Sequence, residues 1–303
     1  MTFVKYMHVE RLSPDNNEIK GILDGKVYIY PKLDGSNHCV WYDDDKEQIR
    51  CASRNQIITS EYDPTKFINK YYLPHKDKIE ALVNDHKKWT FYGEFMQPHV
   101  IRNYLDAVWD DWFVFDVYDR DERRWLRLDE YGPIVNSYGV SVIPCISIIN
   151  NPTDEDLEKC LNSNNYLLDD ANKVGEGIVI KNYGYNNPYG RVIWAKIVRD
   201  EFKMKVKKSS KDRNEDDGFT VESDITMRML SSEFIEKEYY KFTEVYGDWN
   251  DTMIPAFISH VYREWWIDYS FDVLANSKTK VDLGELRKKM AKKTVGTLFK
   301  IRK

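Results

Sequence analysis

The sequence predicts an α+β protein of two domains, and two observations support this fold class. Before residue 205 the chain is dominated by short β-prone runs separated by turn residues, which is typical of antiparallel sheets. After it, apolar residues recur with helical spacing. We therefore expect an N-terminal domain of antiparallel sheets with flanking helices over residues 1–210, and a smaller all-helical C-terminal domain over residues 211–303. The basic, polar run 203–218 between them has the composition of a linker.

The predicted elements follow from local patterns. β-prone runs predict strands at 27–30, 38–42, 48–58, 89–95, 112–118, 142–146, 175–181 and 191–198. The first domain also has three predicted helical segments. The segment 65–84 is interrupted by Pro74, and the segment 129–140 is closed by Gly139. A third helix is expected to begin after Thr153, a candidate cap. The second domain has them at 231–246, 254–274 and 282–291, with Asp282 as a candidate cap.

Composition limits the classes of function. The net charge of −5 carries no overall nucleic-acid signature, so any polyanion must meet a local basic surface. The four cysteines form no Cys-x-x-Cys pair, which favours a reducing compartment over a disulfide framework or zinc fingers. No apolar run approaches the roughly 18–20 residues of a membrane span, and the first residues lack the apolar core of a signal peptide. We expect a cytoplasmic monomer without membrane contact.

A lysine at the end of the first long strand is the leading candidate nucleophile. The run 27–30 leads into Pro31-Lys32-Leu33-Asp34-Gly35-Ser36-Asn37, and the run 38–42 leads out of it. We expect Gly35 to supply a positive φ and Asp34 to bond the local backbone. Such a turn can hold an amine beside a phosphate. The alternative is a hairpin shoulder with a surface lysine.

Several other charged residues lie, like Lys32, near the ends of predicted strands. Lys32, Glu94, Glu176 and Lys196 each lie at or near the end of a β-prone run, and Arg54 follows another. The cations suit a polyphosphate, and the glutamates suit a divalent cation. Phe115 is placed to stack on a base, and Asp116 to bond a sugar or orient the base.

This constellation indicates covalent nucleotidyl transfer. Lys32 would attack the α-phosphorus of a nucleoside triphosphate and release pyrophosphate. The amine must be neutral, which a nearby cation such as Lys196 and a bound metal would favour. No P-loop string is present. His38, next to the turn, is expected to pack or hydrogen-bond rather than act as a base.

In their order, six motifs resemble those of the covalent nucleotidyltransferase superfamily, which contains DNA ligases, RNA ligases and mRNA capping enzymes. The similarity extends over residues 27–200. The motifs are Lys32-x-Asp34-Gly35, Ser53-Arg54-Asn55, Phe91-Tyr92-Gly93-Glu94, Phe113-Val114-Phe115-Asp116, Glu176-Gly177-Ile178-Val179-Ile180-Lys181 and Trp194-Ala195-Lys196.

The RNA ligase 2-type branch is the most similar. Asn37 looks like that branch's asparagine near the reactive phosphate, and Phe115-Asp116 like its aromatic–acid pair. A helical tail also differs from the β-barrel OB domain that usually follows in DNA ligases and capping enzymes. One departure is Trp194, which stands where the branch often has a first motif V lysine. Whether Lys181, Arg199 or another cation replaces that charge is open.

The resemblance implies an ATP-dependent RNA ligase that uses Mg²⁺ (or Mn²⁺) and a lysyl-AMP intermediate to join 3′-hydroxyl and 5′-phosphate ends of RNA. The implied substrate is a nicked duplex or broken ends, in RNA repair, and in the host cytoplasm for a viral chain. A DNA ligase, a capping guanylyltransferase and an inactive end-binding protein are the alternatives. The implied nucleotide-binding residues are Lys32, Asn37, Arg54, Glu94, Phe115, Lys181 and Lys196; Glu176 would bind the metal, and Arg54 and Asn37 the RNA.

Overall fold

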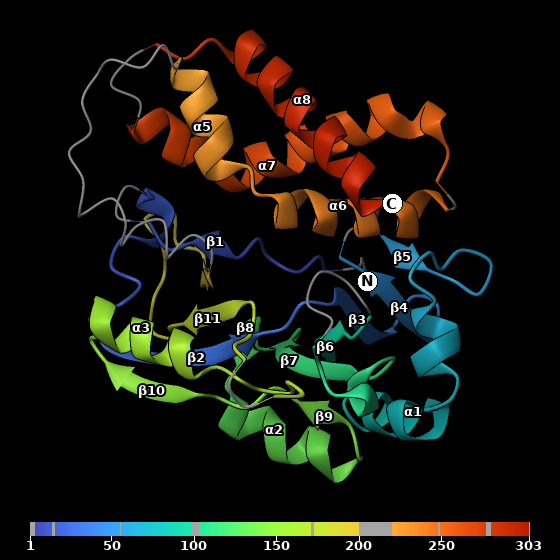
Figure 1. Cartoon of the computed structure of the whole chain (residues 1–303). Helices are drawn as coiled ribbons and strands as arrows, with labels where there is room; N and C mark the ends of the chain where they lie inside the picture. The colour runs from blue at the N-terminus through green and yellow to red at the C-terminus, as the bar shows by residue number, and fades with distance from the viewer. Residues whose placement is uncertain are drawn as a thin grey trace. The chain divides into compact units, whose positions relative to one another are not determined.

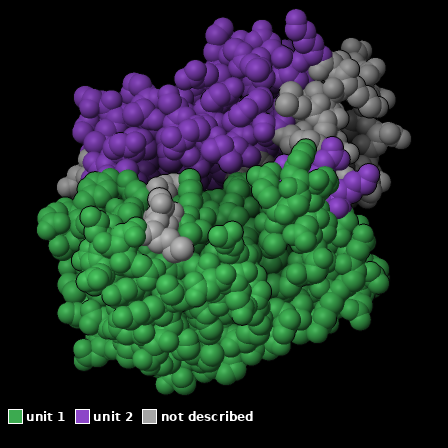
Figure 2. Space-filling model, turned by 180° about the vertical axis from the view of Figure 1, so that it is seen from behind, with its two compact units in different colours: residues 1–10, 21–199 green, residues 11–20, 200–303 purple. Residues whose placement is uncertain are grey.

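The computed structural model divides the chain into two compact units. It describes residues 4–13, 16–54, 56–97, 103–170, 173–199, 220–247, 249–276 and 280–302. The first unit comprises residues 1–10 and 21–199, and the second comprises residues 11–20 and 200–303 (Figures 1 and 2). The predicted boundary at residue 210 and the basic run that precedes it fall in 200–219, outside the described residues.

Two sheets form the frame of the first unit (Figure 1). Sheet A has the strand order β1-β12-β11-β2-β10, and β2 pairs antiparallel with both β10 and β11. Sheet B has the order β5-β4-β3-β6-β7-β8, and β9 pairs parallel with β7. Sheet A consists of β1 (Glu10–Arg11), β2 (Lys26–Lys32), β10 (Ser147–Asn150), β11 (Gly177–Lys181) and β12 (Ala195–Val198). Sheet B consists of β3 (Ser36–Asp43), β4 (Gln48–Ser53), β5 (Ile57–Ile58), β6 (Trp89–Phe95), β7 (Trp112–Asp119), β8 (Arg124–Leu126) and β9 (Ser141–Val142).

Helices cover one face of sheet B. They are the π-helix η2 (Ile68–Tyr72), α1 (Lys76–Asp85) and α2 (Leu128–Ser137), which share an apolar core with β3, β6 and β7. Figure 1 shows α1 and α2 on the same side of this sheet. The first unit also contains η3 (Asp106–Val108) and α3 (Asp154–Ser163), and the short η1 (Asn17–Ile19) belongs to the second unit.

The opposite face of sheet B packs against sheet A. Cys39, Ala52 and Tyr92 of sheet B form a buried cluster with Trp194, and Val179 of β11 packs against it. Strand side chains alternate between the two faces of a sheet, so every second residue of these strands points into this layer. The layer therefore brings residues from distant parts of the sequence together.

Several local predictions are confirmed, and two strands need correction. The helical segment 65–84 is interrupted around Pro74, and Thr153 caps α3. The predicted strand 142–146 is instead split between β9 and β10, because Pro144 lacks the amide hydrogen that a ladder needs. The predicted strand 191–198 begins only at Ala195, since the amide of Arg191 donates to the side chain of Asn187 in a turn.

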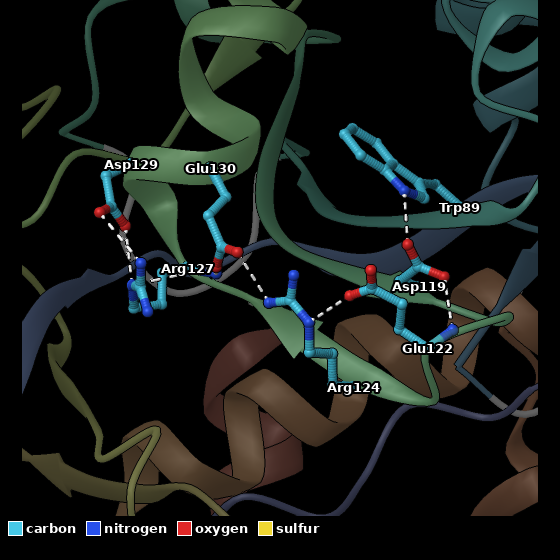
Figure 3. Close-up of polar contacts among 7 residues, drawn as sticks. All are labelled: Trp89, Asp119, Glu122, Arg124, Arg127, Asp129 and Glu130. Atoms are coloured by element: carbon cyan, nitrogen blue, oxygen red, sulfur yellow. Dashed lines mark hydrogen bonds and ion pairs between the residues drawn. The ribbon is translucent and has the colours of Figure 1, made fainter.

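A polar network joins the β7–β8 hairpin to the start of α2 (Figure 3). Asp119 accepts hydrogen bonds from the indole of Trp89 at 3.0 Å and from the amide of Glu122 at 3.0 Å. Arg124 bridges Glu122 and Glu130, and Glu130 also accepts from the amide of Arg127 at the helix start. These contacts fix the hairpin's turn and give α2 a defined first turn.

Between residues 220 and 302, the regular elements that the structure describes in the second unit are helices. Its elements are α5 (Val221–Met229), α6 (Ser232–Tyr246), η4 (Asp251–Met253), α7 (Ile254–Asn276) and α8 (Leu283–Ile301). Helix α5 was not predicted, and α8 runs ten residues past the expected end at Ala291. Asp282 caps α8 as expected, accepting from the amides of Gly284 and Glu285. The α+β fold class is confirmed. No helix among the described residues is long and apolar enough to span a membrane.

The buried carboxylate of Glu238 makes the stability of the second unit depend on pH. Burial alone would raise the pKa of Glu238, but Lys241 and His260 at 2.9 Å and 2.8 Å lower it to about 2. A depressed pKa stabilises the fold above the ordinary value of 4.5, and this contribution is lost as the pH falls towards 2. We expect Glu238→Gln to cost on the order of 3 kcal/mol of unfolding free energy at pH 7.

Urea unfolding of the wild type and of Glu238→Gln between pH 7 and pH 2.5 measures this difference. It should shrink steadily below about pH 5, where the unfolded chain takes up the proton first. A difference that does not change with pH would contradict the assignment.

Candidate active site

Strand register places the candidate lysines on one face of sheet A. Lys32 of β2 pairs with Gly177 of β11, and Lys196 of β12 pairs with Val179. Lys181 lies four residues along β11 from Gly177, so it shares this face. All three lysines therefore point into the layer between the sheets.

The amine of Lys32 is ion-paired with Glu176. Its Nζ lies 2.5 Å from Oε2 of Glu176, and the two side chains are 20% and 12% exposed. Glu176 directly precedes β11, and the pairing of Gly177 with Lys32 holds the two residues side by side. The pair is thus fixed by the sheet and is still reachable from solvent.

The turn after Lys32 is tied to sheet B. Glu94 of β6 pairs with Asn37 of β3, and Oε1 of Glu94 accepts the amide of Gly35 at 3.0 Å. Gly35 does not have the positive φ that we expected. It is required for space, because a Cβ there would lie 2.5 Å from the carbonyl oxygen of Phe95.

A β-bulge presents Phe115. Val114 pairs with Gly93 and Asp116 pairs with Tyr92, which leaves Phe115 as the extra residue of β7. Its side chain is half-buried, whereas both neighbours are buried. A bulge re-aims a side chain, and here it leaves an aromatic ring partly accessible beside buried Asp116.

Asp116 lies at the centre of a buried polar cluster, where it is 0% exposed. Its Oδ1 accepts from Nζ of Lys181 at 2.7 Å, and its Oδ2 accepts from the hydroxyl of Tyr6 at 2.5 Å and from the indole of Trp194 at 3.2 Å. Lys181 also donates to the carbonyl of Phe115 at 2.7 Å. The carboxylate therefore anchors β7 internally instead of facing a sugar, which corrects the expectation from the sequence.

Burial dominates the electrostatics of this pair. It raises the pKa of Asp116 and lowers the pKa of Lys181, while their mutual attraction opposes both shifts. Both side chains are at most 2% exposed, so water does not compensate their charges. Each charge is therefore balanced mainly by the other.

The cations considered as substitutes for the missing motif V lysine are engaged with protein acceptors. Lys181 is bound in the buried cluster, and Arg199 donates to the carbonyls of Gly175 and Leu161. Trp194 is fully buried and donates to Asp116. Lys196 is a half-buried cation on the same face as Lys32.

The N-terminal segment carries two residues that the sequence analysis missed. The hydroxyl of Tyr6 reaches Asp116, and Nδ1 of His8 lies 3.1 Å from the guanidinium of exposed Arg54. No motif marks Tyr6, because its partner is 110 residues away in the chain. His38, by contrast, is buried as expected and bonds Thr65 at 2.7 Å.

Removing the Tyr6 hydroxyl tests its hold on Asp116. We expect Tyr6→Phe to lower the free energy of unfolding by about 1.5–3 kcal/mol, as is usual for a hydrogen bond to a charged group. The matched control is Tyr92→Phe, whose hydroxyl donates to the neutral carbonyl of Val4 at 2.7 Å. Its cost should be only about 1 kcal/mol in urea unfolding. Equal costs for the two variants would argue against a charged acceptor at Tyr6.

The donor set fits a divalent cation bound together with a polyphosphate. Among the described residues, no group of three His, Cys, Asp or Glu side chains could hold a metal by itself. Mg²⁺ commonly takes one or two carboxylates, with waters and substrate phosphates completing its octahedron. Glu176, beside Lys32 and partly exposed, meets this requirement.

Comparison with known proteins identifies the class. Residues 25–198, which include the Lys32–Glu176 pair, match the family model described as RNA ligase. The match covers more than half of the chain, so the chain belongs to the RNA ligase family. Comparison with curated protein sequences finds no significant match.

Solved structures of Naegleria gruberi RNA ligase share the fold. The structure with PPi gives a TM-score of 0.51 at 22% identity, over 69% of this chain and 59% of that chain. A mutant with ATP and Mn gives 0.51 at 20% identity over 68% and 59%, and another with AMP and Mn gives 0.51 at 22% over the same shares. This chain thus spans less than two thirds of the Naegleria chain.

Proposed function

We propose that this chain is an ATP-dependent RNA ligase that seals 3′-hydroxyl and 5′-phosphate ends through a lysyl-AMP intermediate, and that it acts in RNA repair. The observation that carries the proposal is the pairing of Lys32 with Glu176 at 2.5 Å, at the strand end that the family match includes. The complexes of the Naegleria ligase with ATP and Mn support ATP and a divalent cation as its requirements.

The reaction has three balanced steps. The neutral amine of Lys32 forms a bond to the α-phosphorus of ATP, the bond to the β-phosphate oxygen breaks, pyrophosphate leaves, and the lysine nitrogen gives up one proton. An oxygen of the RNA 5′-phosphate then attacks the adenylate phosphorus, and the lysine leaves as an amine that regains a proton. Finally the RNA 3′-hydroxyl attacks the activated 5′-phosphate, loses its proton and expels AMP.

Glu176 has two tasks in this scheme. Before ATP binds, its carboxylate accepts from the ammonium of Lys32, which has no lone pair for attack. Glu176 would also hold a divalent cation, which would supply positive charge to the phosphates. With Glu176 engaged in this way, the Lys32 amine would no longer be held by its carboxylate partner and would face the α-phosphorus.

The remaining residues orient the substrates. Phe115 stacks on the adenine, Glu94 bonds the ribose, and Lys196 contacts the phosphates as a cation on the Lys32 face. Asn37, opposite Glu94 in the sheet, and exposed Arg54 contact phosphate or the RNA end. Lys181 contributes to nucleotide binding through the carbonyl of Phe115, which it holds at 2.7 Å.

Two structural features argue against the alternative functions. A DNA ligase or capping enzyme usually carries an OB barrel after this domain, whereas the described residues 220–302 are helical. An inactive end-binding protein would have no need for the Lys32–Glu176 pair.

Labelling with ATP tests the proposal. The protein is incubated with [α-³²P]ATP or [α-³²P]GTP and Mg²⁺ or Mn²⁺, then chased with a nicked RNA duplex. We expect label from ATP only, first on the protein, then on the RNA 5′ end, followed by sealing. Nicked duplexes with DNA placed on either side define the strand requirement. Wild-type protein that takes no label from ATP would overturn the proposal, and label from GTP would favour capping.

A further inference from the structure

Among the described helices of the second unit, α8 carries the most positive charge. Between Leu283 and Ile301 it has six Lys and Arg residues and one Glu, whereas α6 and α7 each have more acidic than basic residues. The whole chain has a net charge of −5, so this is a local feature and not a property of the composition. Concentrated positive charge on one helix is the electrostatic footprint of polyanion binding.

The basic residues of α8 divide into two sets. Lys293 donates to the carbonyls of Thr226 and Met227 near the end of α5, and Arg287 packs over the ring of Tyr262. These cations hold the helix in its unit, where α8 (red in Figure 1) contacts α5, α6 and α7. The second set faces away from those contacts.

Lys288, Lys292 and Phe299 form an outward stripe. At 100° per residue they lie within about 40° of one another, on the side opposite the buried residues Leu286 and Met290. The Lys288 side chain is 79% exposed and Phe299 is 52% exposed. Among the described residues, this stripe makes one ion pair, between Lys288 and Glu285 at 3.5 Å. An ion pair between such exposed side chains is weak.

Gly296 adds a second observation at the edge of the stripe. A glycine inside a helix costs about 1 kcal/mol relative to alanine. Packing does not require it here, since a Cβ would meet nothing within 4 Å. Glycine is favoured where a ligand approaches the backbone closely.

We propose that this α8 face, comprising Lys288, Lys292, Gly296 and Phe299, binds an RNA strand outside the active site. The lysines contact successive phosphates, Phe299 stacks on a base, and Gly296 lets the strand lie close to the helix. Lysine is depleted at protein–protein interfaces, whereas this face combines two lysines with a single exposed ring. The inference rests on the proposed function, because it assigns a further contact to the same RNA.

Binding of a nicked RNA duplex as a function of salt tests the face in the full chain. Lys288→Gln/Lys292→Gln should weaken binding about tenfold at low salt and reduce the slope of log K against log [salt] by about 1.5–2. The matched control is Lys293→Gln/Lys300→Gln, which removes the same charge from a side of the same helix about 120–140° away from Lys288. Its slope should stay close to that of the wild type.

Gly296 can be substituted without destabilising the helix. Gly296→Ala and Gly296→Glu should both stabilise the helix, since its Cβ is free of clashes. Both should weaken RNA binding, Gly296→Ala because its methyl group keeps the strand from the helix, and Gly296→Glu further, by about tenfold, because it also places a negative charge on the face. Phe299→Ala should weaken it by a similar factor.

The outcomes separate this inference from the proposed function. Every variant is also assayed for adenylation by ATP, which the α8 face should not affect. Wild-type protein that is not adenylated defeats the proposed ligase. Adenylated variants that bind RNA with the affinity and salt slope of the wild type overturn the α8 face alone, as does an equal loss in the two double-lysine variants.

Discussion

Lys32→Ala is expected to abolish covalent labelling by [α-³²P]ATP completely, with the fold intact. The Nζ of Lys32 is the only group in the proposed first step that forms a bond to phosphorus, and alanine offers none. Its loss also removes the 2.5 Å partner of Glu176, but that carboxylate is partly exposed and can be solvated. Protein labelling followed by gel electrophoresis measures the effect, and thermal unfolding checks the fold.

Lys32→Arg separates charge from nucleophilicity. The guanidinium keeps the ion pair with Glu176, but it stays protonated and should give no adenylate. Lys70→Ala is the control for loss of an ordinary paired lysine, since Lys70 lies 2.8 Å from Asp110 in an exposed pair. Its labelling should equal that of the wild type. Label retained by Lys32→Ala would place the nucleophile elsewhere.

Sealing of RNA supplied with a pre-formed adenylated 5′ end isolates the last step. That step forms a bond between the RNA 3′-hydroxyl and the 5′-phosphorus, so it needs no bond to Lys32. Lys32→Ala should therefore still seal this substrate at a measurable rate. A variant inactive in both assays would indicate that Lys32 also acts in the last step and is not needed for adenylation alone.

Much of the site could be predicted because strand ends are visible in a sequence. β-prone runs locate Lys32, Glu94, Glu176 and Lys196 at comparable positions, and alternation tells which residues share a face. The register then confirms that Lys32 adjoins the residue after Glu176 and that Asn37 adjoins Glu94. The roles of these residues stay predictions.

The interior of the sheet layer could not be predicted in the same way. The cluster around Asp116 combines Tyr6, Lys181 and Trp194, and which of them meet depends on how the two sheets pack. The requirement for glycine at position 35 could not be predicted either. A side chain there would clash with the carbonyl of Phe95, which lies on another strand. Local patterns describe turns and periodicity, but they do not describe contacts between layers.

Lys181→Met is expected to have the largest effect on stability, about 3–5 kcal/mol, because it leaves the carboxylate of Asp116 buried without its cation. Methionine fills a similar volume, so little of the cost should come from a cavity. Loss of the bond to the Phe115 carbonyl should also weaken adenylation. Guanidinium unfolding at pH 7 measures the first effect, and ATP labelling measures the second.

The pH dependence and a double variant identify the cause. Burial raises the pKa of Asp116 and Lys181 opposes that rise, so removing Lys181 should raise the pKa further. A carboxyl whose folded pKa exceeds its unfolded value stabilises the protein as the pH falls, so Lys181→Met should regain stability relative to the wild type on going from pH 7 to pH 5. Asp116→Asn/Lys181→Met removes the buried charge and should be more stable at pH 7 than Lys181→Met alone. If the double variant instead loses the sum of the two single costs, the two residues do not act as a pair, and the cluster owes its stability to packing around Trp194 and Tyr6.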